Sequence, residues 1–599
     1  MSTLYRQPGL GVPVPPSVAH AISVSLPTWR DNVGYMEGEK RVMDAMASGY
    51  PRFVVHFSVR KLARICEQKF GTQGEQCLLF PTQKTADHCR AFLVDQSSQS
   101  GSPVQARLVR YLIHPKDERE LASDDAGCRT APSQSRFAEV HIVLFPADIF
   151  PLARLCWQHT GMGISSRYAE HCLSLMPEYI KPSSHLQLTS STEDLSGGKI
   201  DYLMNQRCDN LAVDSAAVAK SALRCRIASM VVRNNPVNFP VHEQTVVTED
   251  DVFLFPTGMY AVWTAYELVV TTRPAAHTIC FGFPYTDTHK ILQKWGPGCH
   301  FFGHGLDTDI DELENILEQE QLKYPSRPPA LALFTEFPSN PLLRSADLPR
   351  LRALADKYNF PIIIDETIGN FVNVSVLPYA DIIVSSMSKI FSGSANVTGG
   401  SLTFNPAGRH YQQLKTRLTS LYEDVYFDED VICMELNSRD LEKRTSVIDV
   451  NTEAVCDFLR SHSIAGGMSS SVIKDILYPK WITRDKYDHC RVKQRKRDVG
   501  EEGRDGGFGG LFSITFTTAA ASATFFDTLS CYKGPSLGTN FTLACPYTIL
   551  AHYSELEWAA KYGVEETLVR ISVGMEDKEA LLRCMEAALK AAQVTSTSL

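Results

Sequence analysis

A regular alternation of short apolar runs and helical stretches constrains the fold of this 599-residue chain more than any other feature. Runs of four or five mostly apolar residues have the length of buried strands and recur at residues 252–255, 278–281, 330–334, 361–365 and 381–385. Helical patterns lie between them, at residues 309–319 and 347–357 among others. Because successive strands with intervening helices favour parallel crossover connections, we expect an α/β fold with a mainly parallel sheet covered by helices.

Changes in composition predict how the chain is divided. We expect four parts: a Pro/Ser-rich, loosely ordered arm (1–30), an N-terminal α/β extension of unassigned role (31–190), a large domain (191–430) and a smaller C-terminal α/β domain (431–599). A strand is expected at residues 51–57 and another at 139–145. The basic and glycine-rich segment 490–510 is expected to form an exposed loop.

Charge and cysteine usage narrow the possible partners and compartment. The formal net charge of −9 gives no reason to expect nucleic acid or an anionic membrane as a partner. Sixteen cysteines are present without a Cys-x-x-Cys pair or a Cys/His cluster at zinc-ligand spacing, so we expect no metal site and a reducing compartment. No apolar stretch reaches the roughly 20 residues of a membrane span, and no targeting segment is evident, which favours the cytoplasm.

Lys389 follows the apolar run at 381–385, and Asp365 ends the run at 361–365. A lysine amine and an aspartate at the ends of neighbouring strands match the needs of pyridoxal 5'-phosphate (PLP). The lysine can form a Schiff base, and the carboxylate can keep the pyridine nitrogen protonated so that the ring acts as an electron sink. Ser386 and Ser388 could hydrogen-bond the cofactor phosphate.

Two further segments supply groups that recognise anions. The strand at 252–255 is followed by a turn with Gly258 and then by a helix, an arrangement in which free backbone N–H groups and the helix dipole can hold a phosphate. Arg570 lies in an apolar run at 568–573 and offers a two-pronged guanidinium suited to a carboxylate.

Several motifs resemble the Cys/Met-metabolism branch of PLP-dependent enzymes, which are enzymes of trans-sulfuration. Besides Asp365 and Lys389, the similarity rests on Glu-Phe-Pro-Ser-Asn-Pro at 336–341, Phe-Pro-Tyr-Thr-Asp-Thr at 283–288 and Ser-Leu-Gly at 536–538. The segments 365–373 and 26–34 resemble the long cystathionine γ-synthase-like proteins of fungi, and this likeness covers nearly the whole chain.

The resemblance implies a fold, an assembly and a set of site residues. The fold would be PLP fold type I, that of aspartate aminotransferase, and the protein would be a homodimer or homotetramer. Tyr285 would stack on the cofactor ring, and Asn340 would approach its phenolic oxygen. The phosphate would be bound by backbone N–H groups of Gly258 and Met259 with the hydroxyls of Ser386 and Ser388, and the substrate carboxylate by Ser536 and Arg570.

The activity implied is γ-replacement on an O-acyl-L-homoserine. Lys389 would act as the base at Cα, and cysteine as the nucleophile would give L-cystathionine. Alternatives are γ-substitution with another nucleophile in specialised metabolism, a cystathionine lyase, and a non-catalytic subunit with a PLP-enzyme fold.

The phosphate clamp departs from the family pattern. Relatives lend a Tyr-x-Arg pair from the neighbouring subunit, and this chain lacks the corresponding string before Pro256. The usual frame would place Arg207 and Asp209 at these two positions, whereas Arg233 is the alternative cation. We favour the frame with Asp209, in which a repulsive carboxylate replaces the arginine.

Overall fold

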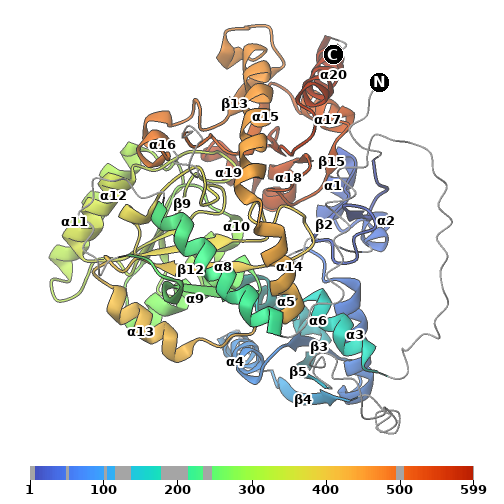
Figure 1. Cartoon of the computed structure of the whole chain (residues 1–599), viewed down its shortest axis with the longest axis vertical. Helices are drawn as coiled ribbons and strands as arrows, with labels where there is room; N and C mark the ends of the chain where they lie inside the picture. The colour runs from blue at the N-terminus through green and yellow to red at the C-terminus, as the bar shows by residue number, and fades with distance from the viewer. Residues whose placement is uncertain are drawn as a thin grey trace. The chain divides into compact units, whose positions relative to one another are not determined.

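The computed structural model describes residues 7–46, 48, 53–99, 101, 104–114, 137–176, 214–233, 246–493 and 505–597 (Figure 1). The chain forms two compact units. One unit comprises Met1–Val54, Leu223–Asp424 and Asn437–Leu599, and the other comprises Val55–Ala222 and Val425–Leu436. The units divide the chain differently from the compositional boundaries, because residues 31–54 pack with the large unit.

A seven-stranded sheet forms the centre of the large unit. Its strands, in spatial order, are β6 (Val252–Phe255), β12 (Gly400–Phe404), β11 (Ile382–Ser386), β10 (Ile362–Asp365), β9 (Leu333–Glu336), β7 (Thr278–Phe281) and β8 (Cys299–Phe302). The pairings from β11 to β8 are all parallel, whereas β12 runs antiparallel to both of its neighbours. The expected mainly parallel sheet is therefore confirmed.

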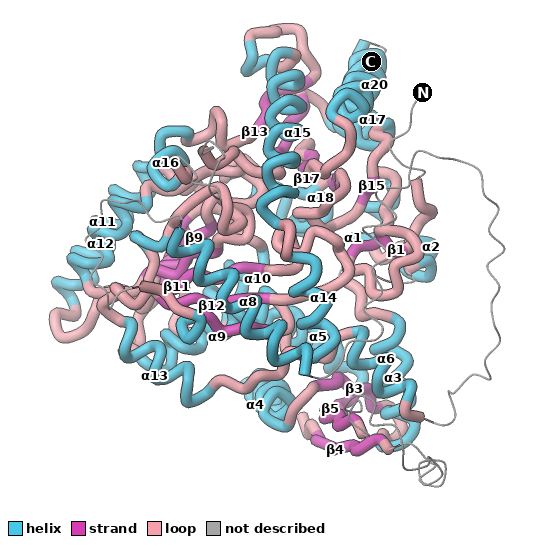
Figure 2. The backbone as a smooth tube through the Cα atoms, in the orientation of Figure 1, coloured by secondary structure: helices cyan, strands magenta, loops and turns pink. Residues whose placement is uncertain are grey.

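Helices cover this sheet, as expected for strands with long buried apolar runs (Figure 2). Helix α9 packs against β11 and β12, and α11 lies beside α12. The helices of this region are α8 (Asp214–Arg233), α9 (Gly258–Thr272), α10 (Thr286–Lys294), α11 (Asp307–Lys323), α12 (Leu348–Tyr358) and α13 (Tyr411–Leu421).

A second, five-stranded sheet belongs to the same unit. Its order is β13 (Ile473–Leu477), β14 (Leu511–Phe516), β17 (Val569–Ser572), β16 (Leu543–Cys545) and β15 (Tyr532–Lys533), antiparallel except for the last pair. Helix α20 packs against α15 and α17 beside it. The helices here are α15 (Leu441–Ser461), α16 (Arg484–Cys490), α17 (Ala519–Thr528), α18 (Tyr547–His552), α19 (Leu556–Lys561) and α20 (Lys578–Thr597).

The N-terminal arm is not loose in its described part. Residues 7–46 form β1 (Pro13–Val14), β2 (Ser23–Val24), α1 (Trp29–Met36) and α2 (Lys40–Ala45). Val24 and Leu26 are each only 1% exposed and share a core cluster with Tyr547 and Leu568. The Leu26 N–H donates to the Lys533 carbonyl at 3.1 Å. Buried apolar side chains and backbone hydrogen bonds thus order a segment whose composition suggested a loop.

The smaller unit contains a three-stranded antiparallel sheet. Its order is β3 (Glu75–Phe80), β5 (Ala138–Pro146) and β4 (Arg107–Ile113). Its helices are α3 (Phe57–Phe70), α4 (Gln83–Gln99), α5 (Phe150–Thr160), α6 (Ser166–Ser174), the first part of α8 and most of α14 (Asp428–Ser438). The strand expected at 139–145 is confirmed as β5. The strand expected at 51–57 is wrong for its described residues, because the His56 side chain caps α3 and Phe57 begins that helix.

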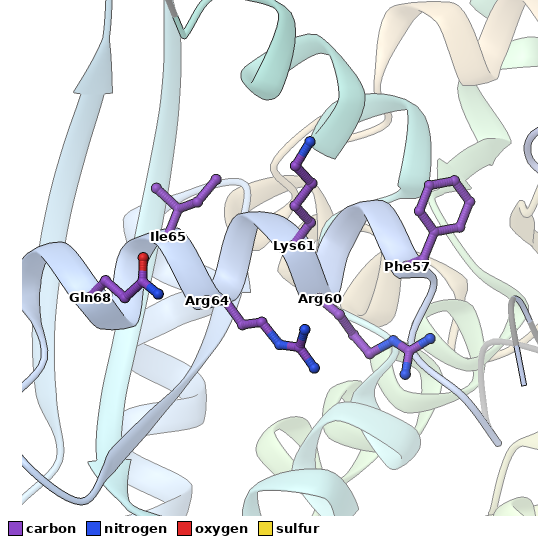
Figure 3. Close-up of a pocket in the computed structure, with 6 residues that line it drawn as sticks. All are labelled: Phe57, Arg60, Lys61, Arg64, Ile65 and Gln68. Carbon is purple, nitrogen blue, oxygen red and sulfur yellow. The ribbon is translucent and has the colours of Figure 1, made fainter. Parts of the chain in front are cut away.

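Side chains of α3 line a pocket of about 360 Å³. Figure 3 shows Arg60 and Arg64 extending from one side of the helix and Lys61 from the other. Burial lowers the pKa of Arg60, and the nearby charge of Arg64 lowers it further. The described residues that line the pocket include three cations and no acid, so its rim is positively charged.

The segment expected to be an exposed loop is buried at its described ends. Cys490 and Phe508 are 3% and 5% exposed. The Gly507 N–H donates to Asn373 Oδ1 at 2.9 Å, and the Gly509 N–H donates to Asp449 Oδ1 at 3.1 Å. Two buried polar side chains therefore bind the glycine-rich end of the segment. The charge of the neighbouring basic run had led us to expect that the whole segment is exposed. Residues 494–504 lie outside the described part of the chain.

Candidate active site

The carboxyl ends of three parallel strands bring the candidate site together. In the register of the sheet, Asp365 at the end of β10 pairs with Glu336 at the end of β9. On its other side Asp365 pairs with Val384 of β11, two residues before that strand ends. Parallel strands end at a common edge of the sheet. The turn that contains Lys389, three residues after the end of β11 at Ser386, therefore lies next to these carboxylates.

Lys389 is buried, at 7% exposure, in a tight turn after β11. Its carbonyl accepts a hydrogen bond from the Gly393 N–H at 2.7 Å. Its Nζ donates to Ser536 Oγ at 3.3 Å. Gly538 allows this approach, because it has a φ of +69° and a Cβ there would lie 2.9 Å from the Lys389 Cβ. The predicted Lys389 and Ser536 therefore meet.

Arg444 of α15 supports the same turn, and sequence reasoning missed it. Its side chain is 2% exposed. Its guanidinium donates to the carbonyls of Ile390 and Phe391, each at 2.9 Å, and to Asn540 Oδ1 at 2.9 Å. These hydrogen bonds satisfy carbonyls that the tight turn leaves without strand partners. No local pattern marks Arg444, because the contacts bridge about fifty residues or more.

Three carboxyl groups gather at the strand ends. Burial raises the pKa of Asp365, whose Oδ1 accepts from the Thr367 N–H at 2.9 Å. Burial, and then the proximity of Asp365, raise the pKa of Glu336 well above its usual range. Burial also raises the pKa of Glu366 to about 8. A cationic ring nitrogen next to Asp365 would relieve this accumulation of buried acids.

Glu336 connects two predicted site residues, although its own role was not predicted. Its Oε1 accepts from the Tyr285 N–H at 2.6 Å, and its Oε2 accepts from the Asn340 N–H at 3.1 Å. The carboxyl group therefore fixes the backbone of both segments next to Asp365. Its position at the end of a strand parallel to that of Asp365 is the signal that could have identified it.

The start of α9 forms a close-packed cradle against β11. Thr257 caps the helix, and its side chain accepts from the Tyr260 N–H at 3.1 Å. The backbone N–H groups of Gly258 and Met259 lie in the first turn, where no intrahelical acceptor is available. A Cβ on Gly258 would lie 2.6 Å from the Ser386 Cβ, so only glycine fits there.

The two predicted serines differ in their surroundings. Ser386 lies against Gly258, and its own N–H donates to Thr367 Oγ1 at 2.8 Å. The Ser388 hydroxyl instead bonds to the backbone of Gly399, accepting from its N–H at 3.0 Å. Ser386 is therefore adjacent to the helix start, whereas Ser388 also holds the neighbouring loop.

Arg570 brings the remaining predicted residues together. It lies on β17 and is 4% exposed. Its Nη1 donates to Asn340 Oδ1 at 3.0 Å, and its Nη2 donates to the Ser536 carbonyl at 3.1 Å. Its guanidinium carbon lies 4.7 Å from the Tyr547 ring centre. Within the described part of the chain it forms no salt bridge, so its charge is available for a substrate carboxylate.

These residues fit PLP. The buried lysine amine, the carboxylate at the end of the adjacent strand and the glycine cradle at a helix N-terminus match its aldehyde, its ring nitrogen and its phosphate. Arg207 and Asp209 lie outside the described residues, as does the side chain of Arg233, which ends α8. The composition of the phosphate clamp stays a prediction.

Two family models match the chain. Residues 58–165 match the N-terminal domain of fungal trans-sulfuration enzymes. Residues 233–590 match the Cys/Met metabolism PLP-dependent enzymes, which confirms PLP fold type I and the predicted cofactor. The catalytic part and the N-terminal extension are thus matched separately.

Similar proteins extend over nearly the whole chain. A cystathionine γ-synthase-like enzyme, iboG2 of Amanita muscaria, is 52% identical, covering 98% of this chain and 96% of its own. Cystathionine γ-synthase of Neurospora crassa is 37% identical, covering 98% and 99%. Alanine racemase ungC of Aspergillus violaceofuscus is 33% identical, covering 99% and 98%. Cystathionine γ-synthase from Xanthomonas oryzae pv. oryzae has a solved structure that is 20% identical, with a TM-score of 0.48, and covers 63% of this chain and 98% of its own.

Proposed function

Because the chain belongs to the family of Cys/Met-metabolism PLP-dependent enzymes, we propose that it catalyses γ-replacement on an O-acyl-L-homoserine with cysteine, giving L-cystathionine. The observation that carries the proposal is the meeting of Arg570, Asn340 and Ser536 next to the Lys389 amine. A guanidinium that forms no salt bridge with the described residues, next to a buried amine, suits an α-amino acid, whose carboxylate and Cα proton must be handled together.

The residues of this chain would divide the work of holding PLP. Lys389 would hold it through its amine, Asp365 would face its ring nitrogen, and Tyr285 would stack on its ring. The phosphate would lie at Gly258 and Met259 with Ser386 and Ser388, and Asn340 would face the phenolic oxygen. When bound, PLP supplies an electron sink that lowers the cost of removing a proton from Cα.

Lys389 would move the protons of the reaction, because its amine and the Arg570 guanidinium both contact Ser536, which places the base near the substrate carboxylate. Arg570 would orient the substrate by its carboxylate. In the net reaction the cysteine sulfur forms a bond to Cγ, the Cγ–O bond breaks, and the acyl group leaves as its carboxylic acid with the bonding pair. The cysteine thiol proton balances the release of that acid.

A second candidate is γ-substitution with another nucleophile in specialised metabolism. It is supported by the 52% identity to iboG2, which exceeds the 37% identity to Neurospora cystathionine γ-synthase. A cystathionine lyase and a non-catalytic subunit are further alternatives. For both candidates we propose a cytoplasmic homodimer or homotetramer, as the sequence led us to expect. Separately, none of the described helices is long and apolar enough to cross a bilayer.

The test is incubation of the holoenzyme with O-acetyl- or O-succinyl-L-homoserine and a panel of nucleophiles, with products identified by mass. Cystathionine formed with cysteine supports the proposal. A product with another nucleophile but none with cysteine supports the second candidate, and release of 2-oxobutanoate alone indicates a lyase.

Arg570→Lys should raise KM for the ester, because lysine keeps the positive charge but loses the two-pronged geometry of the guanidinium. An unchanged KM would assign carboxylate recognition to another cation.

A further inference from the structure

A cavity of about 170 Å³ opens beside Tyr285. Pro284 and Thr286, which flank Tyr285 in the chain, line it together with one face of α10 and residues of α18 and α19. The volume is below the roughly 300–1,000 Å³ of pockets for drug-sized ligands. The cavity therefore suits a molecule of the size of an amino acid.

Four of the nine residues that line the cavity carry aromatic rings. The His289 and Trp558 rings stack, with centroids 5.7 Å apart and planes at 6°. Phe283 packs against His552 and Trp558, at 5.2 and 5.5 Å between centroids. Burial lowers the pKa of His289 to about 4, so this ring is neutral at physiological pH. The stacked His289 and Trp558 rings thus form an uncharged aromatic face on which an ammonium group can be bound.

Two opposite charges stand in this wall. Glu555 Oε1 pairs with His552 Nδ1 at 2.8 Å, which lowers the pKa of Glu555. Its Oε2 makes no hydrogen bond with the described residues. Lys290 likewise forms no ion pair or hydrogen bond with any part of the chain that the structure describes, and its charge contributes to the lowered pKa of Glu555. A carboxylate and an ammonium with free bonding capacity thus share one small cavity.

Two sets of contacts place the cavity next to residues of the candidate active site. Tyr285, between two lining residues, has its N–H bonded to Glu336 beside Asp365. The His552 and Tyr547 ring centroids lie 5.9 Å apart, and the Arg570 guanidinium carbon lies 4.7 Å from the Tyr547 ring centre. One aromatic ring therefore separates the cavity from the arginine that would hold the homoserine ester.

We propose that this cavity docks the second substrate, the nucleophile, as a zwitterionic α-amino acid, with its ammonium at Glu555 Oε2 and its carboxylate at Lys290. This inference rests on the proposed γ-replacement. It adds a recognition site for the nucleophile, separate from the Arg570 group that recognises the ester.

The test compares three thiols as nucleophiles in the holoenzyme, at saturating homoserine ester. L-Cysteine carries both charges, cysteamine lacks the carboxylate, and 3-mercaptopropionate lacks the ammonium. Lys290→Ala should raise KM for cysteine about tenfold or more and that for cysteamine less than about twofold. Glu555→Gln should raise KM for cysteine by a similar factor and that for 3-mercaptopropionate less than about twofold.

Lys294→Ala and Glu557→Gln are matched controls, since both residues are exposed neighbours that do not line the cavity. KM for the ester, measured in every variant, reports whether the fold and the first site are intact. Equal effects on all three thiols, or none on any, would overturn the docking site while leaving γ-replacement standing. Absence of any thiol product from the wild-type enzyme would instead overturn the proposed use of cysteine, and the docking site with it.

Discussion

At the scale of single residues, Lys389 is the group on which the proposed chemistry depends. Lys389→Ala should abolish turnover and the visible band of bound PLP, because the amine that would hold the cofactor is lost. Borohydride reduction and peptide mapping of the wild type should place the pyridoxyl label on Lys389. Lys533 is the comparison, because it is also buried, at 2% exposure, and a label on it would refute the assignment.

Asp365 is predicted to tune the cofactor rather than to hold the fold. In Asp365→Asn the amide oxygen can still accept from the Thr367 N–H, so the melting temperature should change little. The rate should fall by about 100-fold or more, because an amide cannot stabilise a protonated ring nitrogen. We would measure kcat and thermal melting together; near-normal kcat would exclude this role.

Glu366 makes the stability of the fold depend on pH. Burial raises its pKa to about 8, above the ordinary value of 4.5, so between these values the folded state holds a proton that the unfolded state has released. The free energy of unfolding should therefore fall as pH rises toward 8, by up to about 1.4 kcal/mol per pH unit. When the pH is raised from 5.5 to 7.5, the Glu366→Gln variant should lose less stability than the wild type. Thermal melting of both proteins at each pH provides the comparison. Parallel curves for the two proteins would contradict the shifted pKa.

At the scale of elements, the contact of α9 with β11 depends on the missing side chain of Gly258. Gly258→Ala places a Cβ 2.6 Å from the Ser386 Cβ, which must displace the helix start from the strand. We expect weaker retention of PLP on dialysis, followed by absorbance. Gly9→Ala is the control, because its Cβ would meet Val12 at an ordinary 3.8 Å. Equal retention in both variants would show that the cradle is not needed.

The N-terminal arm should behave as part of the core. Leu26 is 1% exposed, so Leu26→Ala should destabilise the protein by about 2–5 kcal/mol through the cavity it leaves. Leu322→Ala is the matched control, since Leu322 is 77% exposed. Chemical unfolding of both variants provides the comparison. A change at Leu26 no larger than at Leu322 would mean that the arm adds little to stability.

Strands with continuous apolar runs were predictable, and strands defined by their neighbours were not. Ile362–Asp365 and Ile382–Ser386 carry the pattern within themselves. Gly400–Phe404 does not, because Ser401 and Thr403 are buried polar residues and the strand is selected by pairing with β11 and β6. The ordered structure of the N-terminal arm was not predicted for a related reason, because it depends on packing against Tyr547 and Leu568, more than five hundred residues away.

The same division applies to the candidate site. Lys389 and Asp365 could be proposed from the sequence, because strand ends place them and their chemistry is distinctive. Glu336 and Arg444 act through hydrogen bonds to distant backbone groups, and no local pattern encodes those distances. The meeting of Arg570 with Asn340 likewise joins two sheets of the large unit.

At the scale of the whole molecule, the smaller unit is assembled from two separated stretches of chain, Val55–Ala222 and Val425–Leu436. Arg167 and Asp430, both buried, form an ion pair at 2.9 Å within it. On the ribosome, the cation is therefore made long before its counter-ion, and the smaller unit cannot be completed until its second stretch, Val425–Leu436, has been made. A gene fragment ending at residue 222 would encode an interior guanidinium with its partner missing, a loss of roughly 3–5 kcal/mol. To express this unit on its own, one would have to fuse the later stretch, Val425–Leu436, to the first one.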